Sequence, residues 1–174
     1  LIGKDENNQD QLYQNPDAYG NAWAVDSLAL IDNYDNLLNQ MKDANLREIG
    51  FVLDKSLPIE TSRNYNSSDL IKIEKIKNSS SHILYDIESL SEQLIVFSEI
   101  YYPSGWQVYL NGEKTNYFDI NYLLRGMIVP KGNHLIEFHF SPKIVKTGIN
   151  IRIITIIITF SIIALMLYRK NKWV

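Results

Sequence analysis

Cysteine is absent from this chain of 174 residues, and histidine occurs at only three positions, His82, His134 and His139. Without cysteine the chain can form no disulfide, thiolate metal site or cysteine nucleophile. His134 and His139 are five positions apart, so in a strand their side chains point to opposite faces. No Ser-His-Asp spacing, glycine-rich phosphate loop or paired carboxylates stand out. The sequence therefore predicts no metal site, no cofactor and no catalytic residue.

Acidic residues outnumber basic ones in most of the chain. From Gly148 onward there are four basic residues and no acidic one. Removing these four from the 17 Lys and Arg leaves 13 against 20 Asp and Glu, so the preceding part carries a net charge of −7. Nucleic-acid-binding domains need a basic face. The sequence therefore predicts no nucleic-acid partner.

The beginning of the chain lacks both a Met and an apolar segment with a basic start. Such a segment would mark a signal peptide. We therefore expect a piece of a longer protein with its targeting information upstream; a processed or engineered N-terminus is the alternative.

Charged residues are nearly missing from residues 149–168, where Arg152 is the single charge. A helix of about 20 residues covers about 30 Å, the thickness of the hydrocarbon core of a bilayer. Tyr168 and Trp173 lie at the far edge, where amphipathic rings are favoured. The run predicts a transmembrane helix followed by a short tail at 169–174; a buried core helix is the alternative. Three basic residues flank each end, so their number does not decide the orientation.

Short alternating segments dominate the rest of the chain. HILYDIE, WQVYL and HLIEFHF alternate apolar and polar residues, as half-buried strands do, and QLIVFSEI is apolar almost throughout, as a central strand is. Asn111-Gly112 is a strong hairpin signal. The sequence predicts a mainly β fold, with an antiparallel, jelly-roll-like β-sandwich core at 61–147.

The first third of the chain has a different pattern. Residues 34–43 place apolar residues at helical spacing, with Asp32 or Asn33 as the expected N-cap. A strand is expected at 50–54. The segment 1–60 is therefore interpreted as a linker, a short helix and the first strands.

Three segments resemble the C-terminal part of the YfhO family of bacterial multi-pass membrane proteins. They are NPDAYGNAW (15–23), FSEIYYPSGWQVYLNGEK (97–114) and NYLLRGMIVPKGNHLIEFHFSPK (121–143), and a last hydrophobic helix follows them in the same order. The resemblance covers nearly the whole chain.

This resemblance implies a location and a role. Members of the family have many membrane helices before this region and a β-rich extracytoplasmic domain near the C-terminus. They are similar to polytopic glycosyltransferases that use polyprenyl-phosphate sugars and are linked to glycosylation of cell-envelope polymers such as teichoic acids. The catalytic acids would then lie outside this chain, with 1–147 outside the bacterial cytoplasmic membrane and 169–174 in the cytoplasm. The implied partners are the lipid bilayer, the preceding helices of the same protein, and a glycan or a polyprenyl-phosphate sugar.

Five residues form the candidate ligand-binding set: Tyr101, Tyr102, Trp106, Asn121 and Arg125. Aromatic rings at the edge of a sandwich can stack on sugars, although large aromatics also serve core packing, and both possibilities stay open.

Two charged residues lie in apolar strands, and such charges are seldom left unpaired. One interpretation is an ion pair between Glu99 and Arg125 that joins two strands. The other places the guanidinium of Arg125 on a lipid or sugar phosphate.

Two other functions remain as alternatives to a domain of a membrane glycosyltransferase. The first is a non-enzymatic, tail-anchored β-sandwich that binds or scaffolds. The second is a self-sufficient hydrolase, which would rest on scattered acids such as Asp119 and Glu137.

Overall fold

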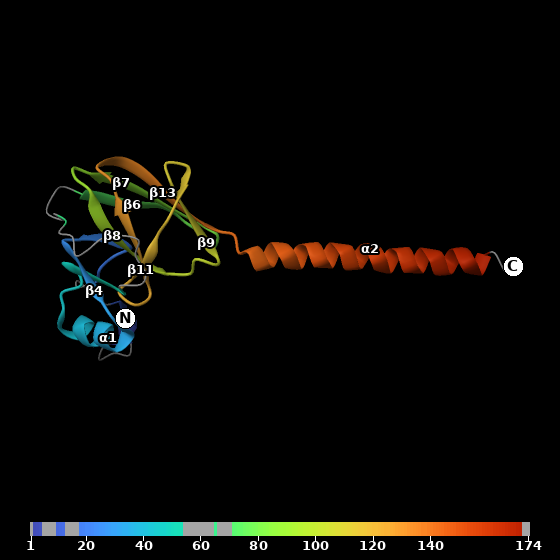
Figure 1. Cartoon of the computed structure of the whole chain (residues 1–174), viewed down its shortest axis with the longest axis horizontal. Helices are drawn as coiled ribbons and strands as arrows, with labels where there is room; N and C mark the ends of the chain where they lie inside the picture. Colours follow the sequence, from blue (N-terminus) through green and yellow to red (C-terminus); the bar gives the residue numbers. More distant parts are fainter. Residues whose placement is uncertain (1, 5–9, 13–17, 54–64, 66–70, 172–174) are drawn as a thin grey trace.

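Two antiparallel sheets face each other in the body of the molecule, and one long helix leaves the body at the C-terminal end (Figure 1). The structure is a computed structural model that describes residues 2–4, 10–12, 18–53, 65 and 71–171. The expected mainly β, antiparallel fold with one C-terminal apolar helix is confirmed.

The first sheet has five strands in the order β10-β9-β13-β7-β6. Their bounds are Ile71–Asn78 (β6), His82–Ser89 (β7), Trp106–Leu110 (β9), Glu113–Thr115 (β10) and Gly132–Phe140 (β13). In β7 the side chains of Ile83, Tyr85 and Ile87 are buried, and the residues between them are more exposed. Because side chains alternate along a strand, one face of this sheet covers the core and the other faces outward.

The second sheet has four strands in the order β11-β12-β8-β3. Their bounds are Ala22–Val25 (β3), Gln93–Ile100 (β8), Phe118–Ile120 (β11) and Leu124–Val129 (β12). The ring of Phe97 lies 4.9 Å from that of Tyr85 and 5.2 Å from that of Phe138, both in the first sheet. These edge-on contacts between aromatic rings join the two sheets in one core.

Residues 94–97 of β8 are buried on both faces, which explains why this part of the strand is apolar without a break. Ile95 and Phe97 face the first sheet, whereas Leu94 and Val96 pack against a third layer. In this layer β4 (Ser27–Ile31) pairs in parallel with β5 (Ile49–Leu53).

Helix α1 (Tyr34–Asp43) supplies the crossover that a parallel pair needs. Leu37 on its inner face packs against Ile31 and Phe51 of the two strands. The side chain of Asn33 caps the helix by accepting a hydrogen bond from the backbone N–H of Asn36 at 2.9 Å. The predicted helix and its cap are confirmed, and so is the strand, which begins one residue before its predicted start at 50.

Three features of the N-terminal region were not expected from the sequence. One is the parallel pairing of β4 with β5. Another is the place of β3, which pairs with β8 and so puts part of the segment 1–60 into the sandwich itself. The third is a separate hairpin, formed by β1 (Ile2–Lys4) and β2 (Asp10–Leu12).

A two-residue turn connects β9 and β10, as Asn111-Gly112 predicts. Leu110 is paired with Glu113, and Asn111 and Gly112 have φ angles of 52° and 84°. Positive φ at both central positions is what the tight turn of a hairpin requires, and Asn and Gly tolerate it best.

Helix α2 (Lys143–Asn171) is apolar on all sides. Its segment Lys143–Met166 is long and apolar enough to cross a membrane, and none of it is buried against the body. Thr155, Thr159 and Ser161 donate their hydroxyl hydrogens to backbone carbonyls four residues earlier. Such internal bonds satisfy polar groups that lipid cannot solvate. The helix begins six residues before the predicted run of 149–168 and contains all of it.

Candidate functional site

The aromatic stretch at 101–105, just before β9, forms a tight turn at the end of the body from which α2 leaves. The N–H groups of Gly105 and Trp106 donate to the carbonyl of Tyr102 at 3.1 and 2.9 Å, and Ser141 donates to the carbonyl of Gly105 at 2.7 Å. A Cβ at position 105 would collide with the rings of Tyr102 and Phe140. Glycine therefore allows these two rings to close over the turn.

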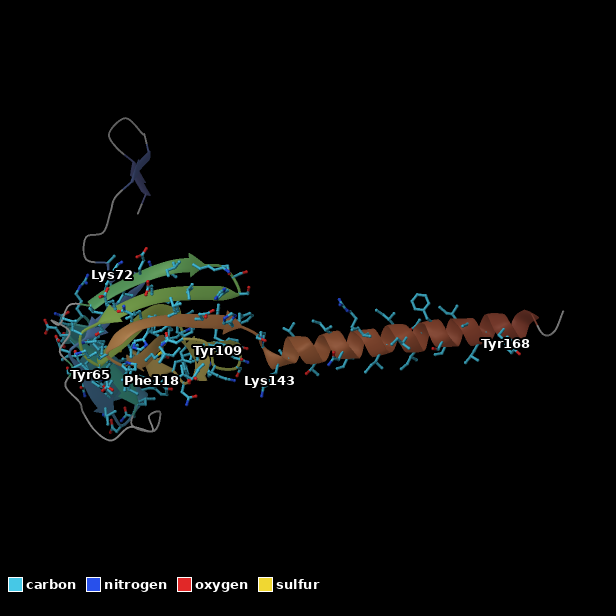
Figure 2. The ribbon with its side chains drawn as sticks, turned by 90° about the horizontal axis from the view of Figure 1, so that it is seen from above. Tyr65, Lys72, Tyr109, Phe118, Lys143 and Tyr168 are labelled. Atoms are coloured by element: carbon cyan, nitrogen blue, oxygen red, sulfur yellow. The ribbon has the colours of Figure 1, made fainter. Side chains whose placement is uncertain are left out.

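A groove of about 590 Å³ opens between this turn, the β9–β10 hairpin and the first residues of α2. Figure 2 shows Lys143, the first residue of α2, where the helix leaves the body. The residues that line the groove combine aromatic rings, hydroxyls, amides and two lysines: Tyr102, Pro103, Ser104, Trp106, Gln107, Val108, Lys114, Thr115, Asn116, Ser141, Lys143 and Ile144. Apolar surface with a few polar groups and positive charge suits a ligand that has a flat ring and an anionic group.

Trp106 lines the groove and also packs against the core. It is half-buried, and its ring lies 5.1 Å from that of Phe140. The guanidinium carbon of Arg125 lies 4.5 Å from the centre of the same ring.

Arg125 is buried in an aromatic cage behind the groove, with 2% of its surface exposed. Its guanidinium carbon lies 4.8 Å from the ring centre of Phe138 and 6.0 Å from that of Tyr117. Its Nε–H donates to the carbonyl of Ile100 at 2.9 Å. Burial lowers the pKa of Arg125, but arginine remains charged in proteins. The cage therefore stabilises a buried cation by interaction with ring faces.

The predicted ion pair between Glu99 and Arg125 does not form. Glu99 instead accepts from Lys75 Nζ at 2.7 Å. The cause is an irregularity in the β8–β12 pairing, where Leu124 lies opposite Ile100 but Arg125 lies opposite Phe97. Glu99 therefore has no partner in β12, and its side chain contacts Lys75 of β6 instead.

Tyr101 lies behind the groove, beside Tyr117. Their rings make an edge contact at 5.1 Å between centres. Burial, with a smaller contribution from Asp119, raises the pKa of Tyr101, and burial raises the pKa of Tyr117 to about 12. The hydroxyl of Tyr117 donates to the carbonyl of Trp106 at 3.2 Å. The two tyrosines therefore pack behind Trp106, which lines the groove.

Asn121 does not line the groove, and its hydrogen bonds give it a structural role. Its backbone N–H donates to the carbonyl of Phe51 at 2.8 Å, and its side-chain Oδ1 accepts from the N–H of Phe51 at 2.9 Å. It has a φ of 50°, in the left-handed region that Asn tolerates. Asn121 thus ties the turn between β11 and β12 to the third layer.

Of the five predicted ligand residues, the structure brings Tyr102 and Trp106 to the groove and places the other three elsewhere. Lys114 and Lys143, which also line it, were missed. The signal that could have found them is weak, since a lysine after a hairpin turn and one at the start of a membrane helix are common.

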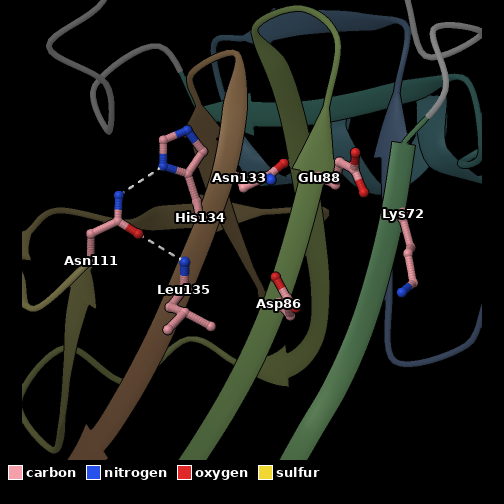
Figure 3. Close-up of a pocket in the computed structure, with 7 residues that line it drawn as sticks. All are labelled: Lys72, Asp86, Glu88, Asn111, Asn133, His134 and Leu135. Atoms are coloured by element: carbon pink, nitrogen blue, oxygen red, sulfur yellow. Dashed lines mark hydrogen bonds between the residues drawn. The ribbon is translucent and has the colours of Figure 1, made fainter.

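A second hollow, of about 420 Å³, lies on the outward face of the first sheet (Figure 3). Lys72, Asp86 and Glu88 line one side of it. On the other side Asn111 accepts from the N–H of Leu135, and its amide contacts His134 Nδ1, both at 2.9 Å. Acidic groups prevail and neither Tyr nor Trp lines it, so it is less suited to an anionic sugar than the groove.

A third group, on the same face, was also missed by the sequence analysis. His82 and His139 each place Nε2 3.1 Å from Oε2 of Glu137. The hydrogen bond from His139, and a smaller effect from His82, lower the pKa of Glu137. Of the two acids weighed for a hydrolase, Asp119 belongs to β11 in the second sheet and Glu137 to β13 in the first.

Comparison with models of protein families gives a match. The family model described as "Bacterial membrane protein YfhO" matches residues 57–152, which is more than half of the chain. No curated protein and no solved structure matches the chain.

Proposed function

Because the chain belongs to the YfhO family of bacterial membrane proteins, we propose that it is the extracytoplasmic C-terminal domain of a multi-pass member. The full protein glycosylates cell-envelope polymers from polyprenyl-phosphate sugars, and its catalytic groups lie outside this chain. Within it, this domain holds the lipid-linked sugar, or the acceptor polymer, at the membrane surface.

The single observation that supports this role is the position and lining of the groove. Lys143 and Ile144 line it and are also the first residues of the helix segment that can cross a membrane. A polyprenyl-phosphate sugar has its chain in the bilayer, so its phosphate and sugar lie at the surface, where this groove opens.

The lining matches the two parts of such a headgroup. Tyr102 is 46% exposed and, with Trp106, offers ring surface to a sugar. Lys114 and Lys143 supply positive charge for a phosphate. The body has a net charge of −7, and these two lysines place positive charge at the groove.

A binding experiment tests the proposal. The chain is placed in nanodiscs and titrated with a polyprenyl-phosphate hexose. We expect Lys114→Glu to weaken binding by about tenfold, which corresponds to ~1.4 kcal/mol, and Tyr102→Ala to weaken binding of the sugar-bearing lipid more than that of polyprenyl phosphate alone. Lys72→Glu, the same charge change outside the groove, is the control. Equal binding by wild type and Lys114→Glu would contradict a role for the groove.

The same substitutions in the full-length protein test the role in cells. The sugar content of the envelope polymers should fall in strains with Lys114→Glu or Tyr102→Ala and stay normal with Lys72→Glu. Normal sugar content after deletion of the whole gene would exclude the glycosylation function.

A second candidate function is a tail-anchored binding or scaffold module without an enzyme. It is favoured by one observation: the segment Lys143–Met166 of α2 is long and apolar enough to anchor the body in a membrane by itself. The gene distinguishes the two functions. Several membrane helices encoded upstream of Leu1 support the first, and an open reading frame that starts near Leu1 supports the second.

A further inference from the structure

Two histidines and a glutamate meet on the outward face of the first sheet, where the proposed function does not use them. Glu137 and His139 are alternate residues of β13, so both point away from the core. His82 begins β7 and lies opposite His139 in the strand pairing.

The donor atoms of these three side chains are close enough to share one ion. His82 Nε2 and His139 Nε2 each lie 3.1 Å from Glu137 Oε2, and the three atoms lie within 4.8 Å of one another. Zinc binds imidazole nitrogen and carboxylate oxygen at about 2.0 to 2.2 Å, so two ligands of a tetrahedral site lie roughly 3.3 Å apart. The two separations of 3.1 Å from Glu137 are close to this value.

We propose that His82, Glu137 and His139 bind a Zn²⁺-like divalent transition-metal ion. Two imidazoles and one carboxylate suit zinc and its first-row neighbours, whereas Mg²⁺ and Ca²⁺ prefer oxygen ligands alone. Three protein ligands leave a fourth position for water or another oxygen ligand, as in zinc sites that keep an open position.

The surroundings hold the three side chains in place before an ion arrives. The imidazoles of His82 and His139 are stacked, with ring centres 4.3 Å apart, and the ring of Tyr109 meets His139 edge-on at 5.3 Å. The neighbouring residues Ile83 and Phe138 are buried in the core. Ligands that extend from rigid strands lose little freedom when a metal binds.

The fourth position has space beside it. A hollow of about 390 Å³ adjoins Glu137 and His139 and is also lined by Tyr109. Gln107 and Ser141 line both this hollow and the groove next to α2. A bound ion would therefore lie beside the groove, although its binding does not depend on the function proposed for that groove.

Direct titration tests the proposal. The full chain in detergent is titrated with Zn²⁺ alone against a chromophoric chelator, at about pH 7.5 because protons compete with a metal ion for its ligands at lower pH. We expect one ion per chain. The double variant His82→Ala/His139→Ala should bind about 100-fold or more weakly, because even groups outside the ligand set cost about 10- to 100-fold. Glu137→Gln should weaken binding to a smaller extent.

The third histidine provides a matched control. His134 is on β13 but contacts Asn111 rather than the cluster, so His134→Ala should retain wild-type affinity. Co²⁺ gives a second readout, since the visible absorption of a tetrahedral complex should appear in wild type and His134→Ala and be lost in the double variant. Circular dichroism checks that each variant is folded. Zn²⁺ affinity that is unchanged in a folded double variant, or lost in His134→Ala, would overturn the proposal and leave Glu137 as a plain hydrogen-bond acceptor for two imidazoles.

Discussion

Strand β8 and helix α2 each contain a strongly apolar run, at residues 94–97 and 149–168, but the two runs have opposite surroundings. Residues 94–97 of β8 are completely buried between the first sheet and the third layer. In α2 every described side chain from Lys143 to Met166 is exposed. The fold itself buries the apolar run of β8. The apolar side chains of α2 are not covered by the body and need a different medium around them.

Apolar surface therefore stabilises the molecule in two ways, by burial within the fold and by contact with lipid. Burial in β8 contributes to the free energy of folding, at roughly 25 cal/mol per Å². The same kind of side chain in α2 contributes only when lipid replaces water around it. Membership of a membrane-protein family agrees with lipid as that medium. Substitutions in β8 should therefore change unfolding, and substitutions in α2 should change membrane insertion.

The largest effect is expected in the core. Phe97→Ala removes a ring that contacts Tyr85 and Phe138 and should lower the free energy of unfolding by about 3 to 5 kcal/mol. Urea unfolding followed by tryptophan fluorescence measures it. Tyr102→Ala, in the groove, is the control and should stay within about 0.5 kcal/mol of wild type, as for surface residues in general. If both variants lost the same free energy of unfolding, Tyr102 would contribute as much to stability as Phe97, which would contradict the distinction between core and groove.

In α2 the expected effect is on insertion rather than folding. Ile157→Lys places a charge near the middle of the apolar segment, at a cost of about 2.5 to 3.5 kcal/mol. The fraction of protein that resists alkaline extraction from membranes should fall, while the unfolding curve of the body stays unchanged. Ile149→Lys lies near the end of the helix, where the side chain can reach the headgroups, and should insert nearly as well as wild type. Loss of body stability in Ile157→Lys would instead mean that α2 packs on the sandwich.

Arg125 is an exception inside the body, because it is a buried charge held by aromatic rings. Arg125→Ala should destabilise the body by about 2 kcal/mol, since it removes both packing and the cation–π contacts. Arg125→Met keeps most of the volume and removes the buried charge, so its unfolding curve should lie closer to that of wild type. If Met destabilises as much as Ala, the charge of Arg125 matters more than its packing.

The smallest expected effect concerns pH. Burial raises the pKa of Tyr117 to about 12, above the usual value of about 10. Between these values the folded state binds more protons than the unfolded state, so stability falls as pH rises from about 10 to about 12. Tyr117→Phe removes the hydroxyl that ionises. In thermal melts its stability should therefore fall less than that of wild type between about pH 10 and about pH 12. An identical slope in both proteins would mean that Tyr117 ionises as it does in the unfolded chain.

Local sequence signals were enough for several parts of the fold. Asn111-Gly112 sets its own turn, Asn33 caps α1 through a bond three residues away, and the unbroken run 94–97 indicates a strand covered on both faces. The apolar length of α2 also needs no partner to be recognised. Each of these features depends on neighbours in sequence.

The parts that could not be predicted depend on pairing between distant strands. The ion pair of Glu99 was predicted with the wrong partner because the irregular β8–β12 register is not visible in either strand. His82 and Glu137 are 55 positions apart and meet only through the β7–β13 register. The groove likewise joins a turn, a hairpin and a helix start that are separate in the sequence.

The central proposal is that the sandwich lies on the extracytoplasmic side of the membrane, with α2 as its tether. The chain contains no cysteine, so single cysteines report their own positions once any cysteine elsewhere in the full-length protein has been replaced. Lys114→Cys in the groove and Lys172→Cys in the tail are treated with a membrane-impermeant maleimide on intact spheroplasts and after permeabilisation. The account predicts that Cys at 114 reacts in intact spheroplasts and that Cys at 172 reacts only after permeabilisation. The reverse pattern, or equal reaction of both in intact spheroplasts, would contradict it.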